Sequence, residues 1–205
     1  MNIKICGITE IETLNFLIEK NVNYAGFIFH KNSPRNVTNE FLNKVRGLDF
    51  QQTRPVCVFV NSDKAYVRSV LKYFEKPIIQ FHGNESEDFC KSFGCQFWKA
   101  LRVKDSISLE GIKHFKSADA ILLDTYKKDI FGGTGSTFDW NLIPSDLIYE
   151  NKLVLSGGLT IENLKSAFNI NPWCLDFNSG VESAPGLKDH LKVAEILSFI
   201  RRNGK

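Results

Sequence analysis

Short apolar segments alternate with longer amphipathic ones along this chain of 205 residues, and the alternation is repeated eight times. Several of the short segments are apolar without interruption, as at residues 56–60 and 121–123. Strands buried on both faces of a parallel sheet have this pattern, because helices cover each face. The predicted strands are 3–6, 24–29, 55–60, 77–81, 96–102, 120–124, 152–156 and 173–177.

The intervening segments predict helices, because their apolar residues recur at helical spacing. Asn61, Ser62 and Asp63 form a predicted N-terminal cap for the third helix, whereas the sixth, around 139–143, is short and weak. The clearest apolar stripes are Leu14, Phe16, Leu17 and Ile18; Phe41, Leu42 and Val45; Val67, Val70, Leu71 and Phe74; and Val193, Ile196, Leu197 and Ile200.

Eight β/α units in succession predict an α/β fold, a single compact (β/α)8 TIM barrel that spans residues 1–205 as one domain. The rival is an open doubly wound sheet, which the strand count alone does not exclude. That fold commonly carries G-x-G-x-x-G after its first strand, but Cys6-Gly7-Ile8-Thr9 stands there instead. The closed barrel is therefore favoured.

Composition restricts the classes of function. With 43% hydrophobic and 24% charged residues the chain is typical of soluble proteins, and no apolar run reaches the roughly 18–20 residues of a membrane helix. The N-terminus does not resemble a secretory signal. Five cysteines without a C-x-x-C pair indicate reduced thiols in a cytoplasmic protein, with neither a disulfide framework nor a metal site. A net charge of +3 is too small to indicate a nucleic-acid partner.

Catalytic groups of a barrel lie at the carboxyl ends of its strands. That rule selects Cys6 and Asp124, which could form an acid–base pair across the barrel mouth. Glycine and a helix N-terminus after Cys6 would stabilise its thiolate, and the apolar neighbours of Asp124 would keep that carboxyl protonated. Packing explains a buried cysteine equally well, and a cap or salt bridge explains an aspartate, but their shared location favours catalysis.

Two glycine pairs after the last two predicted strands match the usual phosphate site of such barrels, where exposed backbone amides hold the anion. These are Gly157-Gly158 and Ser179-Gly180, each of which could also be a simple tight turn. A third glycine-rich stretch at 132–135 is predicted to be a mobile lid. Arg35 could clamp a substrate carboxylate, although a solvated arginine is the simpler explanation.

Ten short blocks of this chain follow the pattern of one known enzyme family. The first, Lys4-Ile5-Cys6-Gly7-Ile8-Thr9, resembles the opening K-I-C-G-[IL]-T of the phosphoribosylanthranilate isomerases. No single block decides the matter, but together they are specific because they span nearly the whole chain in the family's order. The others are GFIF at 26–29, SPR at 33–35, VFVN at 58–61, QFHG at 80–83, LLDT at 122–125, GGTG at 132–135, TFDW at 137–140, LSGGL at 155–159 and SGVE at 179–182.

The resemblance implies a cytoplasmic isomerase of the aldose–ketose type in tryptophan biosynthesis. It would convert N-(5-phosphoribosyl)anthranilate into 1-(2-carboxyphenylamino)-1-deoxyribulose 5-phosphate without a metal or organic cofactor. In the family the residue matching Asp124 is the general acid and the one matching Cys6 the general base. Monomers and homodimers both occur. The predicted substrate-binding residues are Arg35, His82, Gly157, Gly158, Asp176, Ser179 and Gly180.

The chain departs from the family pattern at Asn36, Ser136 and Asn178, which puts substrate affinity and lid behaviour in doubt but leaves Cys6 and Asp124 intact. Three alternatives stay open. Indole-glycerol-phosphate synthase would carry catalytic lysine and glutamate, and a dual-substrate histidine/tryptophan isomerase uses paired aspartates. The third alternative is a non-catalytic barrel that only binds a phosphorylated ligand.

Overall fold

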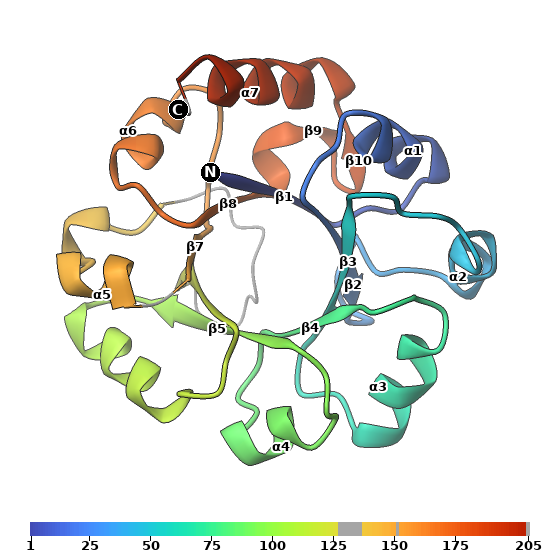
Figure 1. Cartoon of the computed structure of the whole chain (residues 1–205), viewed down its shortest axis with the longest axis horizontal. Helices are drawn as coiled ribbons and strands as arrows, with labels where there is room; N and C mark the ends of the chain where they lie inside the picture. The colour runs from blue at the N-terminus through green and yellow to red at the C-terminus, as the bar shows by residue number, and fades with distance from the viewer. Residues whose placement is uncertain (127–136, 151, 204–205) are drawn as a thin grey trace.

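Eight parallel strands form a closed barrel in the order β1 to β8, with helical segments around it (Figure 1). The computed structural model describes residues 1–126, 137–150 and 152–203. The predicted closed barrel is confirmed, and the open sheet is excluded, because β1 pairs with β8. The strands are β1 Asn2–Cys6, β2 Tyr24–Phe29, β3 Arg54–Phe59, β4 Ile78–Phe81, β5 Phe97–Val103, β6 Ala120–Thr125, β7 Leu153–Leu155 and β8 Cys174–Phe177.

The helical layer is uneven. Most units contain an α-helix, but β5 is followed by a 3-10 segment, and a small hairpin of β9 Glu182–Ala184 and β10 Leu187–Lys188 follows β8. The α-helices are α1 Ile11–Glu19, α2 Asn39–Val45, α3 Lys64–Leu71, α4 Glu87–Lys91, α5 Ser145–Glu150, α6 Leu164–Asn169 and α7 His190–Asn203; the 3-10 segments are η1 Ser106–His114, η2 Trp140–Leu142 and η3 Ser179–Val181.

Two local predictions for the helices have different outcomes. The predicted cap before α3 is confirmed, since the Asp63 side chain accepts a hydrogen bond of 2.8 Å from the backbone of Tyr66. The sixth helix was predicted around 139–143, but the structure has only the 3-10 turn η2 there, and α5 begins at Ser145. Pro144 explains the difference, because it forces Ile143 into an extended conformation and a helix starts readily after proline.

Side chains of each strand alternate between two apolar regions. Cys57 and Phe59 of β3 pack outward against the helices, whereas Val56 and Val58 point into the barrel. Trp98 also lies in the interior and is 1% exposed, with its ring in edge contact with Tyr24. The barrel is therefore a filled core in which bulky rings are concentrated near the amino ends of the strands.

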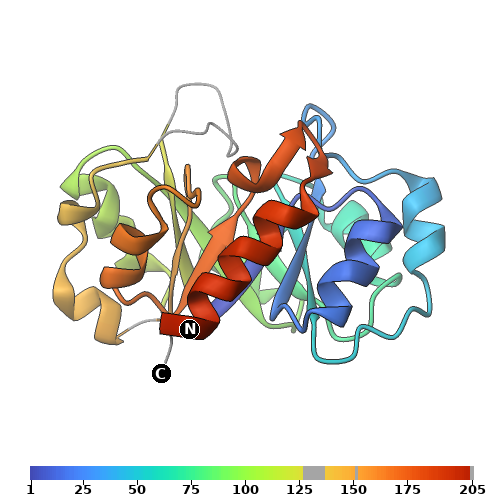
Figure 2. The same cartoon turned by 90° about the horizontal axis from the view of Figure 1, so that it is seen from above.

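The two ends of the barrel differ. Figure 2 shows the N-terminus and the end of α7 at one end, and the hairpin of β9 and β10 at the opposite end, toward which the strands run. Polar residues collect at this second end, where Gln80, Asp124, Ser156 and Asp176 are all buried. No helix in the described ranges has the length and apolar character needed to cross a membrane.

Candidate active site

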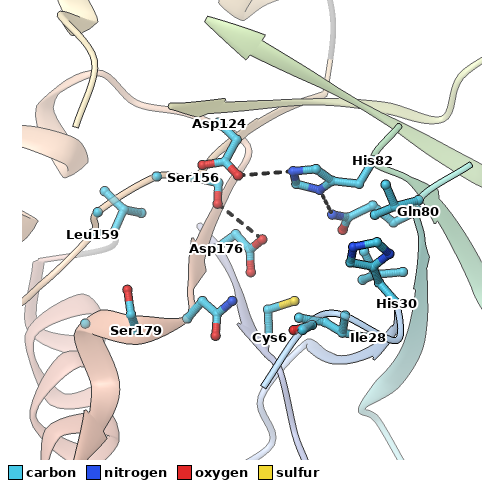
Figure 3. Close-up of a pocket in the computed structure, with 17 residues that line it drawn as sticks. Cys6, Ile28, His30, Gln80, His82, Asp124, Ser156, Leu159, Asp176 and Ser179 are labelled. Atoms are coloured by element: carbon cyan, nitrogen blue, oxygen red, sulfur yellow. Dashed lines mark hydrogen bonds and ion pairs between the residues drawn. The ribbon is translucent and has the colours of Figure 1, made fainter. Parts of the chain in front are cut away.

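A pocket opens at the carboxyl ends of the strands (Figure 3), where the barrel rule predicts chemistry. All of the predicted site residues except Arg35 line it. Figure 3 shows Cys6 and Asp124 on opposite sides, with Asp176 between them. The predicted residues in its lining are Cys6, His82, Asp124, Gly157, Gly158, Asp176, Ser179 and Gly180.

Cys6 ends β1 and is 5% exposed. Its thiol fits against Gly26 of β2, where a Cβ atom would lie only 2.7 Å from Cys6 Sγ. Burial raises the pKa of the thiol, and the ammonium of Lys4 opposes that effect. The helix terminus expected to stabilise the thiolate is not adjacent, because α1 begins only at Ile11. A nearby buried cation takes that place.

Lys4 and Asp176 form a buried ion pair beneath Cys6. Lys4 is fully buried, and its Nζ donates to Asp176 Oδ2 at 2.9 Å. Burial works against the ammonium, but Asp176 and Cys6 nevertheless raise the pKa of Lys4. Burial raises the pKa of Asp176, while Lys4 lowers it. Asp176 Oδ1 is buried and has no hydrogen-bond partner in the part of the chain that the structure describes, so it is available to a ligand in the pocket.

Asp124 ends a chain of three buried side chains. Its Oδ1 accepts a hydrogen bond of 2.8 Å from the backbone of Thr125, and its Oδ2 lies 3.1 Å from His82 Nε2. The other ring nitrogen of His82, Nδ1, lies 3.0 Å from Gln80 Nε2. Both of these side-chain contacts are drawn as dashed lines in Figure 3. Asp124 is therefore held by two neighbours while one edge of its carboxyl group faces the pocket.

The two glycine loops require glycine for steric reasons. Gly157 and Gly158 have φ values of +84° and +66°, which residues with a side chain adopt only at a cost in strain. A Cβ atom on Gly157 would lie 2.8 Å from Asp124 Oδ1, and one on Gly180 would overlap the carbonyl group of Leu159. The loop after β7 therefore packs against both the carboxyl group of Asp124 and the loop after β8, and both loops line one end of the pocket.

Arg35 lies beside this pocket and is paired with another residue. Its Nε and Nη2 donate to Glu182 at 2.8 and 2.6 Å, and Lys188 Nζ donates to the same carboxylate at 2.6 Å. The Arg35 side chain passes close to Gly7, directly after Cys6. Although burial opposes ionisation of Glu182, Arg35 and Lys188 lower its pKa. One carboxylate thus neutralises part of a two-cation cluster at the edge of the site.

Several residues that shape this site were missed from the sequence. Lys4 and Gln80 each stand two positions before a predicted site residue, so the period of a strand could have placed them on the same face. Gly26 and Glu182 lie within the matching blocks, but no local pattern connects Glu182 with Arg35, 147 positions away. Among the departures, Asn178 lines the pocket and accepts from Lys188 at 3.0 Å. The predicted lid at 132–135 and Ser136 lie outside the described residues.

Comparison with known proteins agrees with this geometry. The family model described as N-(5'-phosphoribosyl)anthranilate isomerase matches residues 3–198. The chain belongs to that family. A phosphoribosylanthranilate isomerase of Geobacter metallireducens is 41% identical over 205 residues, covering 98% of each protein, and one of Legionella pneumophila is 37% identical over 202 residues, covering 98% of this chain and 97% of the relative.

Solved structures of phosphoribosylanthranilate isomerases superpose on the whole barrel. The enzyme from Thermotoga maritima has a TM-score of 0.88 at 32% identity and covers 98% of this chain and 99% of that one. A second structure was determined in complex with reduced 1-(o-carboxyphenylamino)-1-deoxyribulose 5-phosphate. It has a TM-score of 0.82 at 30% identity and covers 98% of this chain and 99% of the other.

The pair of Lys4 and Asp176 generates a prediction about pH and stability. Lys4→Met leaves a buried carboxylate without its counter-ion, so at neutral pH we expect a loss of about 3–5 kcal/mol in the free energy of unfolding. Without Lys4 the pKa of Asp176 rises further in the folded state, so the folded protein binds a proton more readily than the unfolded chain. The loss is therefore largest above that raised pKa and shrinks as the pH falls through it.

Urea unfolding of wild type and Lys4→Met at a series of pH values measures this difference. Lys44→Met is the matched control, because Lys44 pairs with Glu40 at the surface, and we expect a change within about 0.5 kcal/mol. A difference between wild type and Lys4→Met that does not vary with pH would show that the lysine stabilises the fold by packing alone.

Proposed function

We propose that this chain catalyses the Amadori rearrangement of N-(5-phosphoribosyl)anthranilate to 1-(2-carboxyphenylamino)-1-deoxyribulose 5-phosphate in tryptophan biosynthesis. The observation that carries the proposal is the placement of Cys6 and Asp124 on opposite sides of one pocket, in a barrel that matches this family over its length. A base and an acid on opposite sides of a bound sugar can act on different atoms of it in succession.

Asp124 performs the first step in this proposal. Its carboxyl proton passes to the ring oxygen of the ribose while the nitrogen lone pair forms a C=N bond, so the bond between C1′ and the ring oxygen breaks. The product is an open-chain Schiff base with a positively charged nitrogen, and Asp124 is left as a carboxylate. The hydrogen bonds from Thr125 and His82 stabilise that carboxylate, which favours the transfer.

Cys6 performs the second step. The cationic nitrogen withdraws electrons from C1′ and acidifies the C2′–H bond, so the chemistry proposed here requires neither a metal nor an organic cofactor. The Cys6 thiolate removes the C2′ proton, and the bonding pair moves to give an enolamine, which tautomerises to the ketone. The positive charge of Lys4 stabilises this buried thiolate and so opposes the rise in the pKa of Cys6 that burial causes.

The two ends of the substrate would bind to opposite parts of the site. The phosphate is placed against backbone amides of the loops that contain Gly157, Gly158, Ser179 and Gly180. Arg35 is assigned to the anthranilate carboxylate. Lys188 remains as a counter-ion for Glu182 when Arg35 turns to that ligand. His82 and Asp176 complete the predicted binding set, because both line the pocket and Asp176 Oδ1 has no partner among the described residues.

We further propose that residues 1–205 act as one catalytic domain in the cytoplasm, as a monomer or homodimer, with a small phosphorylated substrate. The five cysteines are all free thiols, as a reducing compartment requires. The Thermotoga maritima relative is described as dimeric, and monomers of it have been generated. The alternative function is a non-catalytic barrel that binds a phosphosugar, and the assay of turnover below separates the two.

The purified chain should convert the substrate, with loss of the anthranilate fluorescence, and Cys6→Ser should lower kcat by about 10²–10⁴-fold. A serine hydroxyl is far too weakly acidic to act as the base, while its size leaves binding of a reduced product analogue nearly unchanged. Cys95→Ser is the control, because Cys95 is exposed. Retention of more than about a tenth of kcat by Cys6→Ser would falsify the assignment.

Asp124→Asn should lower kcat far more than it raises KM, because the amide has no carboxyl proton to donate in the transition state. Steady-state kinetics with the same fluorescence assay measures both constants. Asp146→Asn, at an exposed position, is the control for the substitution itself. Normal kcat combined with a raised KM would identify Asp124 as a binding residue, and the acid would then be another group.

Arg35→Ala should weaken binding of anthranilate-bearing ligands and leave phosphate binding nearly unaffected, whereas Gly158→Asp should weaken binding of phosphate. Each change removes or opposes a charge-assisted contact worth roughly 1.5–3 kcal/mol, or about 10–100-fold in affinity. Calorimetry with a reduced substrate analogue and with inorganic phosphate separates the two ends. Equal weakening of both ligands by Arg35→Ala would assign this arginine to the fold or to the phosphate site.

A further inference from the structure

His82 and Gln80 form a chain of hydrogen bonds that ends at Asp124. We propose that Gln80 is a positioning residue that determines which ring nitrogen of His82 carries the hydrogen, so that His82 presents an N–H group to Asp124. The inference rests on the proposed function in one respect only, the role of Asp124 as the acid. The hydrogen on the ring is a property of the protein that is measurable without substrate.

The geometry of the three groups fixes the direction of each hydrogen bond. An amide nitrogen only donates, so His82 Nδ1, which lies 3.0 Å from Gln80 Nε2, must accept. In a neutral imidazole the hydrogen then resides on Nε2, which lies 3.1 Å from Asp124 Oδ2. Gln80, His82 and Asp124 are 1%, 8% and 3% exposed, so water does not readily replace any member of the chain.

The backbone around His82 is held independently of the hydrogen bonds that join Gln80, His82 and Asp124. His82 N donates to Phe59 O at 2.8 Å, across to β3. The next residue, Gly83, is held at both ends, because its N donates to Glu85 at 2.9 Å and its carbonyl accepts from Lys99 at 2.7 Å. A buried ion pair of 2.9 Å joins Glu85 to Lys99. These contacts fix the position of the His82 backbone. Gln80 therefore determines only how the imidazole ring is oriented and which ring nitrogen carries the hydrogen.

The consequence for catalysis follows from the charge on Asp124 before and after proton transfer. A hydrogen bond donated by His82 stabilises the carboxylate, which exists after the proton has left, more than the carboxylic acid. If Nδ1 carried the hydrogen instead, Nε2 would accept a hydrogen bond from the Asp124 carboxyl group. That bond would stabilise the protonated acid and oppose release of its proton. Gln80 thus makes Asp124 a better acid through His82, in the way that a buried orienting group sets the tautomer of a catalytic histidine.

The side-chain oxygen of Gln80 supports the same orientation of the amide group, with its nitrogen toward His82. Oε1 is buried and has no hydrogen-bond partner within the described ranges, and Gln80 lines the pocket. A hydroxyl group of a ligand there would donate to Oε1, while the amide nitrogen stays on His82. Substrate binding would therefore hold the amide in the orientation that favours proton donation by Asp124.

Other charged groups lie next to the hydrogen-bonded side chains of Gln80, His82 and Asp124, and substitutions of Gln80 leave these groups unchanged. Asp176 on β8 interacts electrostatically with both Asp124 and His82, and it is paired with Lys4 on β1. On β5, Arg102 stands in register with Asp124. A change in pH dependence that appears only when residue 80 is altered is thus assigned to the hydrogen bond that residue 80 makes.

The decisive measurement is nitrogen NMR of the histidine rings in the protein without substrate. The chain has four histidines, and loss of one set of signals in His82→Asn assigns those of His82. In wild type we expect Nδ1 of His82 to be bare and Nε2 to carry the hydrogen. In Gln80→Glu an ionised carboxylate accepts from Nδ1, so Nδ1 should become protonated. A protonated Nδ1 in wild type overturns the inference.

Kinetics supplies the second measurement. Gln80→Leu should lower kcat by about 10-fold or more, because the ring is no longer held in one tautomer. KM should rise by at most about 10-fold, because only one hydrogen bond to a ligand hydroxyl group is lost. The pH profile of kcat/KM should change as well, because the hydrogen bond between His82 and Asp124 is no longer held in one direction. Gln96→Leu is the matched control, since Gln96 is exposed and lies just before β5, outside the pocket.

The outcomes separate this inference from the proposed function. Lower stability of Gln80→Leu with an unchanged pH profile and an unchanged His82 tautomer would mean that Gln80 only packs, and the inference fails. If wild type shows no turnover but Nδ1 is bare and becomes protonated in Gln80→Glu, the isomerase assignment fails and the control of His82 by Gln80 stands.

Discussion

Lys4 and Asp176 face each other across the seam at which the barrel closes. They are register partners in the pairing of β1 with β8, and their side chains form a buried ion pair of 2.9 Å. The same two strands lead to Cys6 and to the loop after β8 that is proposed to bind phosphate. Cys6 lies two residues beyond Lys4 on β1, so this cation and the thiol share one face of the strand. Closure of the sheet brings the carboxylate of Asp176 next to Lys4, and without closure neither charge would be neutralised or positioned.

The other buried charges follow the same principle of pairing near a functional loop. Glu182 holds Arg35 and Lys188 at the edge of the pocket, and Glu85 with Lys99 holds the loop that contains His82. Burying such groups is costly unless they are paired and hydrogen-bonded, and hydrophobic residues of similar volume often stabilise a fold equally well. Their concentration around the pocket is therefore better explained by the demands of the site than by stability.

Two buried oxygens, Asp176 Oδ1 and Gln80 Oε1, have no partner in the described part of the chain, and both residues line the pocket. Native proteins satisfy nearly all buried polar atoms, so such exceptions call for an explanation. A polyhydroxylated, phosphorylated substrate supplies donors that would satisfy both. The aromatic rings at the opposite end of the barrel, such as Trp98 against Tyr24, contact one another and fill the core by packing.

Local pattern was sufficient for the strands and for the site residues that end them. Cys6 and Asp124 were found because the end of an apolar run marks the end of a strand, and that position faces the mouth of a barrel. The same reasoning failed around 139–143, where Pro144 interrupts a weak apolar pattern and moves the helix to Ser145. For Arg35 it left open a clamp for a substrate carboxylate or a solvated arginine, because nothing near Arg35 in the sequence indicates Glu182.

Sequence pattern was enough to predict the order of strands, the closed barrel as the favoured fold, and the family, because these depend on periodicity and on short blocks of adjacent residues. Which charged groups meet became visible only in the folded chain. Lys4 and Asp176 are 172 positions apart, Arg35 and Glu182 147, and His82 and Asp124 42. Such pairs depend on the register between strands and on how loops pack over the barrel end. Local periodicity specifies which face a side chain occupies, but not which residue faces it.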